Sequence, residues 1–211
     1  MKLISINVGK PKKFEWQGKT VTTSIFKTAV NHRCSVTFLN IEGDKQADLQ
    51  HHGGKDMAVY SYDIENYSHW KTKIERKSWE AGLFGENLTT EGLTDDKVRI
   101  GNIYEIGTVK LQAIQPRFPC FKLNIRFGRK DMIERFYDLK RFGIYFRVIQ
   151  EGYINTDDKI SLMEESPFDV TISDVTFCKT SKGGDQEKLK LILVNPWLPE
   201  KVKTGVRMYL R

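Results

Sequence analysis

The stretch VKLQAIQPRFPCFKL, residues 109–123, joins a strand pattern to a loop that carries a single cysteine. Residues 109–114 alternate apolar and polar side chains, as a strand with one buried face does. Pro116 and Pro119 then remove two backbone donors and hold the residues before them in extended conformations. We therefore expect a strand that ends in a stiff loop, which fixes the direction of Cys120.

Other segments with the same alternation predict a sheet around this strand. Strand and helix do not alternate regularly as a parallel sheet requires, and the sequence has no glycine-rich nucleotide-binding motif. We therefore expect a mainly β fold with inserted helices, a mixed and mostly antiparallel β-barrel. The expected strands are residues 3–8, 57–62, 98–106, 109–114 and 143–149.

Helical patterns interrupt the strands and dominate the end of the chain. Residues 63–75, with Asp63 as N-cap, and residues 131–141 each gather apolar side chains on one face. Residues 172–180 combine β-branched residues, which favour a strand, with apolar residues at helical spacing, and we favour a helix.

Two more helices are expected in residues 185–211, separated at Asn195–Pro196 because proline cannot continue the first. The prediction is a β-barrel domain at residues 1–165 and a small three-helix domain at residues 166–211.

Charge and composition limit the classes of partner. The net charge of +7 over 211 residues favours an anionic partner or cofactor. The basic residues are scattered, which does not favour nucleic-acid binding, although Phe14, Trp16 and the Lys12–Lys13 pair could form an aromatic and cationic surface. No apolar run reaches the about 18 residues of a membrane helix, and the first residues lack a signal peptide's apolar stretch. We expect a cytoplasmic protein without membrane contact.

The three cysteines are widely spaced and include no C-x-x-C pair, which argues against a disulfide framework or a zinc ribbon. We expect Cys34 and Cys178 to be packing residues. Arg117 and Lys122 flank Cys120 closely enough for both charges to favour its thiolate. Cys120 could be a small buried hydrophobe, a nucleophile with one of the two histidines as base, or a ligand of a soft metal held mainly by other groups.

Two further stretches concentrate polar residues between regular segments, EGDKQADLQHHGGKD at 42–56 and FGENLTTEGL at 84–93. The first is a glycine-containing turn or a phosphate site, because glycines let backbone N–H groups converge on an anion. Its adjacent histidines point to opposite sides of an extended chain, so a zinc site is not favoured. The second is a turn before a strand, or a place where a carboxylate and a carboxamide pair with a heterocycle.

GDKQAD with HHGG, FGENL followed by GLT, and QPRFPCFKLN occur in an order and spacing that resemble the MOSC domain, and within it the YiiM-like proteins. The resemblance spans residues 3–163, and the tail resembles the three-helix domain that often follows MOSC in this branch. It implies a β-barrel-rich fold that binds molybdenum cofactor. Cys120 stands at the family position whose thiolate completes the sulfur ligands of the metal.

The resemblance also implies roles for residues beyond the cysteine. His52, Gly53 and Gly54 match the family's His-Gly-Gly and are expected to line the cofactor pocket. The family commonly has a basic residue where this chain has Met57, and Lys55 is the candidate substitute for a phosphate contact.

Arg117 and Lys122 match basic positions of the family's cysteine loop, where they could balance the anionic cofactor or hydrogen-bond its sulfurs. Glu86 and Asn87 match its Gly-Glu-Asn-Leu motif, and we expect them to contact the polar edge of the pterin.

The implied reaction is a two-electron reduction of N-hydroxylated compounds, such as N-hydroxylated purine analogues, to amines. Asp44 and His51 are candidate proton donors near the departing oxygen. Nothing resembles a flavin, nicotinamide or iron–sulfur site, so a separate reductase, flavodoxin-like or ferredoxin-like, is expected to supply electrons. A carrier of cofactor or sulfur without turnover is the alternative, and a homodimer is possible.

Overall fold

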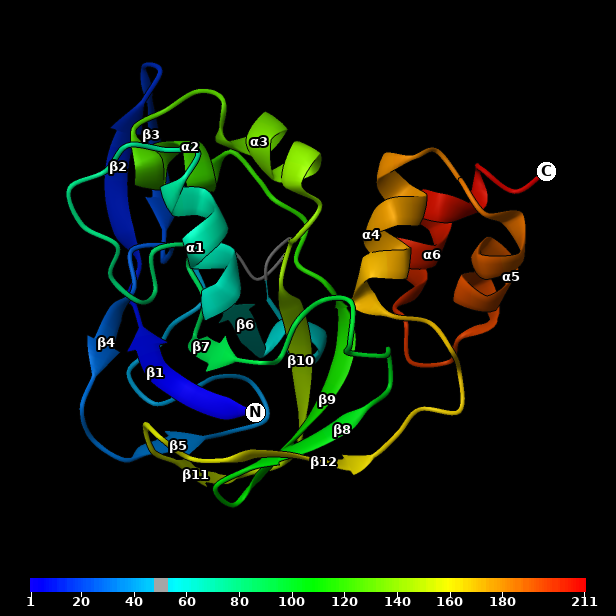
Figure 1. Ribbon diagram of the computed structural model, residues 1–211. Helices are drawn as coiled ribbons and strands as arrows, with labels where there is room; N and C mark the ends of the chain where they lie inside the picture. Colours follow the sequence, from blue (N-terminus) through cyan, green and yellow to red (C-terminus); the bar gives the residue numbers. More distant parts are fainter. Residues whose placement is uncertain (48–52) are drawn as a thin grey trace.

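The centre of the molecule is an eight-stranded sheet in a computed structural model that describes residues 1–47 and 53–211 (Figure 1). All neighbouring strands are antiparallel except β6 and β7. From one edge to the other the strands are β12 (Ile160–Glu164), β8 (Ile103–Ile106), β9 (Val109–Pro116), β10 (Ile144–Gln150), β6 (Val59–Asp63), β7 (Leu88–Glu91), β1 (Lys2–Val8) and β4 (Thr28–Val30).

The expected closed barrel is not confirmed, because the sheet is curled but open in the described part of the chain. The start of β1 approaches the segment before β12, where the N–H of Leu3 donates to the Asp158 carbonyl at 2.9 Å. This contact amounts to an isolated bridge between Lys2 and Lys159, and β12 and β4 remain the edges of the sheet. The twist of the strands therefore brings the two ends together without a continuous ladder.

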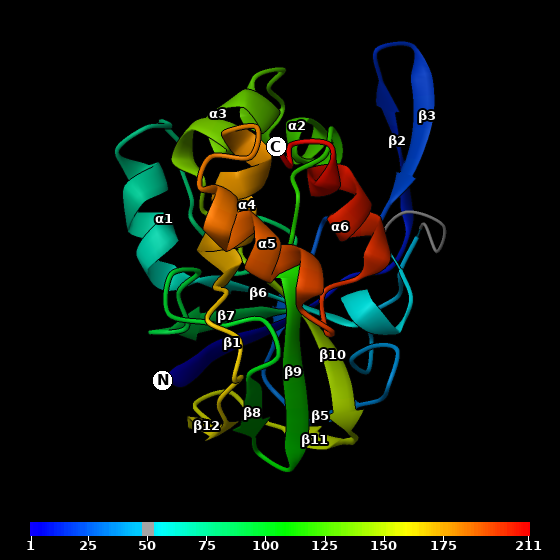
Figure 2. The same cartoon turned by 90° about the vertical axis from the view of Figure 1, so that its right-hand side faces the viewer.

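Four shorter strands form two separate pairs. β2 (Lys12–Trp16) and β3 (Lys19–Thr23) make a hairpin that projects from the body in Figure 2. Its two-residue turn has φ of 51° at Gln17 and 73° at Gly18, the positive values that twisted hairpins favour. β5 (Cys34–Val36) pairs with β11 (Gly152–Ile154).

Most of the expected strands are confirmed, with two corrections at their beginnings. The strands at 3–8, 109–114 and 143–149 correspond to β1, β9 and β10. In the segment 57–62 the strand begins only at Val59, because η1 (Lys55–Met57) is a short 3-10 helix. In the segment 98–106 the strand is confined to 103–106, since residues 98–102 form a turn in which the N–H of Ile100 donates to the carbonyl of Val170.

Three helices lie next to the loop of the cysteine. α1 (Ile64–Lys71) and α3 (Met132–Leu139) occur where the sequence predicts them, and the Asp63 carboxylate caps α1 by accepting from the N–H of Glu65 at 3.1 Å. α2 (Lys122–Phe127) was not expected. Aromatic side chains of α1, α3 and β6 pack together in a cluster that includes Trp70, Phe136 and Tyr62.

The end of the chain forms α4 (Ile172–Thr180), α5 (Gln186–Val194) and α6 (Glu200–Arg207), as expected, and these lie beside β9 and β10 (Figures 1 and 2). Their buried Val175, Leu189 and Val206 belong to the same hydrophobic cluster as Leu3 and Leu111 of the sheet. The division into two domains stays a prediction, because the three helices share their core with the sheet. Among the described residues, no helix is both long enough and apolar enough to cross a membrane.

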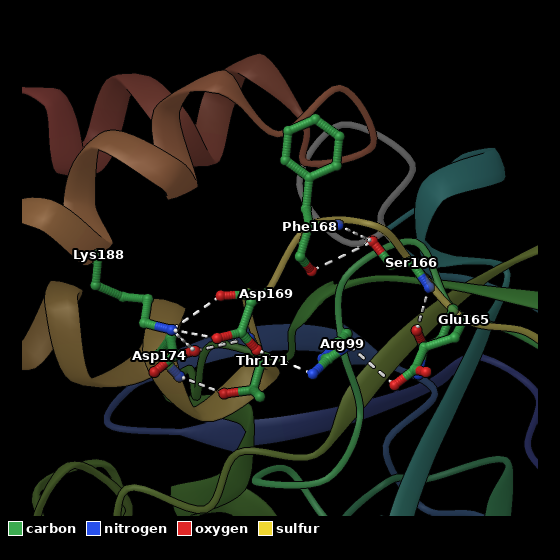
Figure 3. A network of polar contacts seen from close by, with 9 residues as sticks. Arg99, Glu165, Ser166, Phe168, Asp169, Thr171, Asp174 and Lys188 are labelled. Carbon is green, nitrogen blue, oxygen red and sulfur yellow. Dashed lines mark hydrogen bonds and ion pairs between the residues drawn. The ribbon is translucent and has the colours of Figure 1, made fainter.

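A network of charges holds the linker before α4 (Figure 3). Asp169 pairs with Arg99 at 3.2 Å and with Lys188 at 3.4 Å, and Lys188 also reaches Asp174 at 3.4 Å. Thr171 and Asp174 form a capping box at the start of α4. Each exposed pair contributes little stability by itself, but together with the capping box they define where α4 begins relative to the sheet.

A buried carboxyl makes the stability of the fold depend on pH. Asp95 is 4% exposed, and its Oδ2 accepts from the N–H groups of Phe142 at 2.8 Å and Gly143 at 2.9 Å, just before β10. Burial raises the pKa of Asp95 from 3.8 to about 6. The folded chain therefore binds this proton more tightly than the unfolded chain, so the associated stability is full below about pH 4 and is lost as the pH rises through about 6.

We expect Asp95→Asn to remove this dependence, because the amide oxygen can still accept both N–H groups and nothing ionises. Between about pH 4.5 and pH 7.5, the unfolding free energy of the wild type should fall by about 2 kcal/mol relative to that of the variant. Urea unfolding of both proteins across this range measures the difference. A difference that does not change with pH would contradict the assignment.

Candidate functional site

A pocket with a cavity volume of ≈ 90 Å³ lies where the cysteine loop meets β6, β10 and the segment after β3. It is smaller than the about 300–1,000 Å³ of a typical site for a drug-sized ligand. The side chains that give it chemical character are those of Lys27, Asn87, Arg117, Cys120, Lys122 and Tyr145.

Cys120 contributes a partly exposed thiol to this pocket from the loop between β9 and α2. The loop is held at both ends, since the N–H of Arg117 donates to the Gly143 carbonyl at 3.0 Å and the N–H of Leu123 donates to the Cys120 carbonyl at 2.9 Å. Cys34 and Cys178 are buried, as predicted for packing residues, and burial raises the pKa of both thiols. Cys120 is therefore the accessible cysteine of the chain.

Arg117 places a buried cation beside the thiol. The residue is 7% exposed, and its guanidinium lies 5.4 Å from the centre of the Tyr60 ring. Within the described residues, its Nη1 has no hydrogen-bond partner. A buried guanidinium nitrogen without a partner is costly, and an anion in the pocket would satisfy it.

Lys27 is a second buried cation, which sequence reasoning missed. Its Nζ lies 2.5 Å from Oδ1 of Asp44, and burial lowers its pKa. The Asp44 carboxylate also accepts from the N–H of Gly9 at 2.8 Å and from Nδ2 of Asn87 at 2.9 Å. With three donors directed at its side chain, Asp44 positions Lys27 and Asn87 in the pocket.

Glu86 requires a correction, because it does not reach the pocket. The residue is fully buried, and Oε1 accepts from the hydroxyl of Tyr67, the N–H of Gly82 at 2.8 Å and the hydroxyl of Thr89 at 2.9 Å. Oε2 accepts from the N–H of Phe84 at 3.0 Å. Burial raises the pKa of the Glu86 carboxyl. Glu86 thus holds the turn from which Asn87 enters the pocket, and it has no surface left for a pterin.

The glycine loop lies beside the pocket instead of lining it. Gly54 starts η1 with φ of 91°, and its N–H donates to the side-chain oxygen of Gln46 at 3.2 Å. Gln46 and Met57 line the pocket, whereas Gly53 and Gly54 are not among its lining residues and Lys55 is an exposed residue outside it. The predictions for His51 and His52 fall outside the described residues.

Two tyrosines of adjacent strands complete one wall. Tyr60 of β6 stands opposite Tyr145 of β10 in the sheet register, with ring centres 5.4 Å apart. The alternation of both strands was visible in the sequence, but their pairing was not. Nothing in the sequence around Lys27 signals its role, because its partner Asp44 is 17 residues away.

The donor set of the described residues does not form a metal site on its own. No group of three or more His, Cys, Asp or Glu side chains comes together in residues 1–47 and 53–211. A metal bound at Cys120 would therefore need most of its ligands from another molecule.

Comparison with known proteins identifies a matching family model and relatives that cover most of the chain. The model of the MOSC domain family matches residues 48–161. The uncharacterised protein YflK of Bacillus subtilis is 37% identical over 170 residues, which cover 81% of this chain and 76% of YflK. A protein of Gibberella moniliformis named reductase is 34% identical over 165 residues, 77% of this chain but 29% of that protein.

Among solved structures, YiiM from Geobacillus stearothermophilus superposes with a TM-score of 0.82 at 32% identity. The superposition covers 99% of this chain and 98% of YiiM. The similarity therefore includes the three helices at the end of the chain as well as the sheet.

Proposed function

Since the chain belongs to the MOSC domain family, with YiiM-like relatives in sequence and structure, we propose that it is a molybdenum-cofactor-dependent oxidoreductase. Its proposed substrates are N-hydroxylated compounds, such as N-hydroxylated purine analogues, which it reduces to amines. The observation that carries the proposal is an accessible thiol in a pocket with buried cations and without other metal ligands among the described residues. The relative named reductase supports the class of reaction.

The residues of the pocket suit the cofactor chemically. A molybdenum atom held by two cofactor thiolates needs one thiolate from the protein, and Cys120 offers it. The cofactor is anionic, and the pocket presents Arg117 with an unused Nη1, together with Lys27 and Lys122. The small cavity volume fits the metal end of the cofactor better than the whole pterin.

Each side chain has a definite task in this proposal. The cofactor, when bound, supplies the two-electron chemistry. Cys120 holds the metal through Sγ, and Arg117 hydrogen-bonds an anionic group through Nη1. Lys27 holds a proton at Nζ, where its lowered pKa makes release easier, and Asp44 keeps that ammonium in place. Tyr145 limits the access of water from the side of β10.

The proposal includes partners and location. Electrons would come from a separate reductase of the flavodoxin or ferredoxin kind, because these acidic proteins complement a net charge of +7. The reaction would take place in the cytoplasm. The second candidate function is a carrier of cofactor or sulfur, for which the same thiol would suffice.

We expect protein from a host that makes molybdenum cofactor to contain near-stoichiometric molybdenum and to reduce an N-hydroxylated purine with a reduced dye as electron source. Protein from a host unable to make the cofactor is the matched control and should lack both properties. Elemental analysis and chromatography of the amine product provide the measurements. Metal without turnover would favour the carrier, and repeated preparations without metal would overturn both readings.

A further inference from the structure

A second cavity, with a volume of ≈ 220 Å³, lies between the sheet and the helices at the end of the chain. Its walls come from β9, β10 and the cysteine loop on one side and from α4 and α6 on the other, elements that lie side by side in Figures 1 and 2. Met57 and Tyr145 line both this cavity and the Cys120 pocket. The two cavities are therefore neighbours, separated by these two side chains.

The lining of the second cavity combines apolar side chains with two lysines, Lys179 and Lys201. Pro116, Phe118 and Val202 give apolar walls. Lys179 uses one of its three donors on the Gly205 carbonyl at 2.8 Å, and Lys201 is exposed. Neither ammonium forms an ion pair with a carboxylate of the described residues.

A buried amide adds a polar group to this apolar lining. Gln115 is 4% exposed and lines the cavity. An amide in the wall of a cavity can donate to and accept from hydrogen-bonding groups on the edge of a ligand.

We propose that this cavity binds the ring of the substrate and that the preferred substrates carry a negative charge on that ring. This inference rests on the proposed function and adds the substrate class. A planar aromatic ring matches the apolar walls, its polar edge matches the Gln115 amide, and a carboxylate or phosphate offsets the two ammonium groups. The N-hydroxyl group would then point past Tyr145 toward Cys120.

Gly205 keeps the cavity open. Glycine is disfavoured inside a helix, yet Gly205 lies within α6 and lines the cavity. A Cβ at this position would lie 3.1 Å from Nζ of Lys179, the end of a flexible side chain. Gly205→Val should therefore fold while filling part of the cavity, without touching the residues of the Cys120 pocket.

The charge preference can be tested with two substrates of equal size, 4-hydroxylaminobenzoate and its neutral amide, 4-hydroxylaminobenzamide. Each takes two electrons from the reduced dye and two protons, the N–O bond breaks, and the aromatic amine and water leave. We expect kcat/KM to be about threefold to fivefold higher for the carboxylate, as an exposed ion pair allows. Lys201→Glu should reverse this preference, whereas Lys203→Glu, the same charge change two residues further along α6, should leave it in place.

Binding of the products gives a readout that does not need turnover. By calorimetry, 4-aminobenzoate should bind more tightly than 4-aminobenzamide, and Gly205→Val should weaken both at an unchanged melting temperature. If Lys201→Glu lowers the molybdenum content and leaves the preference for the carboxylate unchanged, the cavity binds the cofactor and the inference fails. Equal affinity for the two products, or no effect of Gly205→Val, would also overturn it while leaving the reductase proposal intact. If the products bind at this cavity but no turnover is found, the reductase proposal would be refuted, whereas the cavity would remain a binding site for charged aromatic rings.

Discussion

Replacing Cys120 by alanine should remove molybdenum from the protein and lower turnover by more than about 100-fold. Loss of a group that only supports a metal ligand typically costs 10–100-fold, so loss of the ligand itself should cost at least as much. Cys120 is partly exposed and bonds to the rest of the loop through its backbone, so the variant should remain folded. Elemental analysis, steady-state kinetics and a melting curve of the same preparation measure the three quantities.

Cys34→Ala provides the matched control, because it removes a thiol that is fully buried and does not line the pocket. It should lower stability modestly and leave the molybdenum content unchanged. If Cys120→Ala retained both metal and turnover, the thiol would be a packing residue after all and the reductase proposal would lose its metal ligand.

Replacing Glu86 by alanine should destabilise the protein by about 3–5 kcal/mol, the range for breaking a buried charged network. The change leaves four hydrogen-bond donors in the core without their acceptor, among them the hydroxyls of Tyr67 and Thr89. Glu86→Gln retains one acceptor oxygen but turns an N–H₂ group toward a donor, and about 1–3 kcal/mol is expected for it. Urea unfolding at neutral pH measures both changes.

This prediction also separates the two readings of Glu86. If the residue holds the turn, Glu86→Gln at low temperature should bind molybdenum in proportion to its folded fraction. If the residue touches the pterin, as its place in the sequence motif suggested, stability would be nearly unchanged and cofactor would be lost.

The elements that the sequence predicts well are those whose pattern lies within a few neighbouring residues. β1, β9 and α3 each have a clear alternation or helical spacing and a recognisable break. α2 has only six residues and follows a proline-rich loop, so its periodicity is too short to detect. The barrel was an expectation from the irregular order of strands and helices and from the family resemblance, whereas the open sheet depends on how the start of β1 meets residues 157–160.

The same distinction applies to the candidate site. The sequence by itself determined the stiff loop that carries Cys120 and the nearby Arg117, because these lie within one short stretch whose prolines and charges are local properties. The fold decided that the Cys120 thiol is partly exposed. Only the tertiary structure decided that Lys27 and Asp44 pair in the pocket, that Tyr60 faces Tyr145, and that Glu86 turns into the core. Each of these depends on contacts between residues far apart in the chain. Burial and strand pairing determine such contacts, and the local sequence pattern carries no information about them.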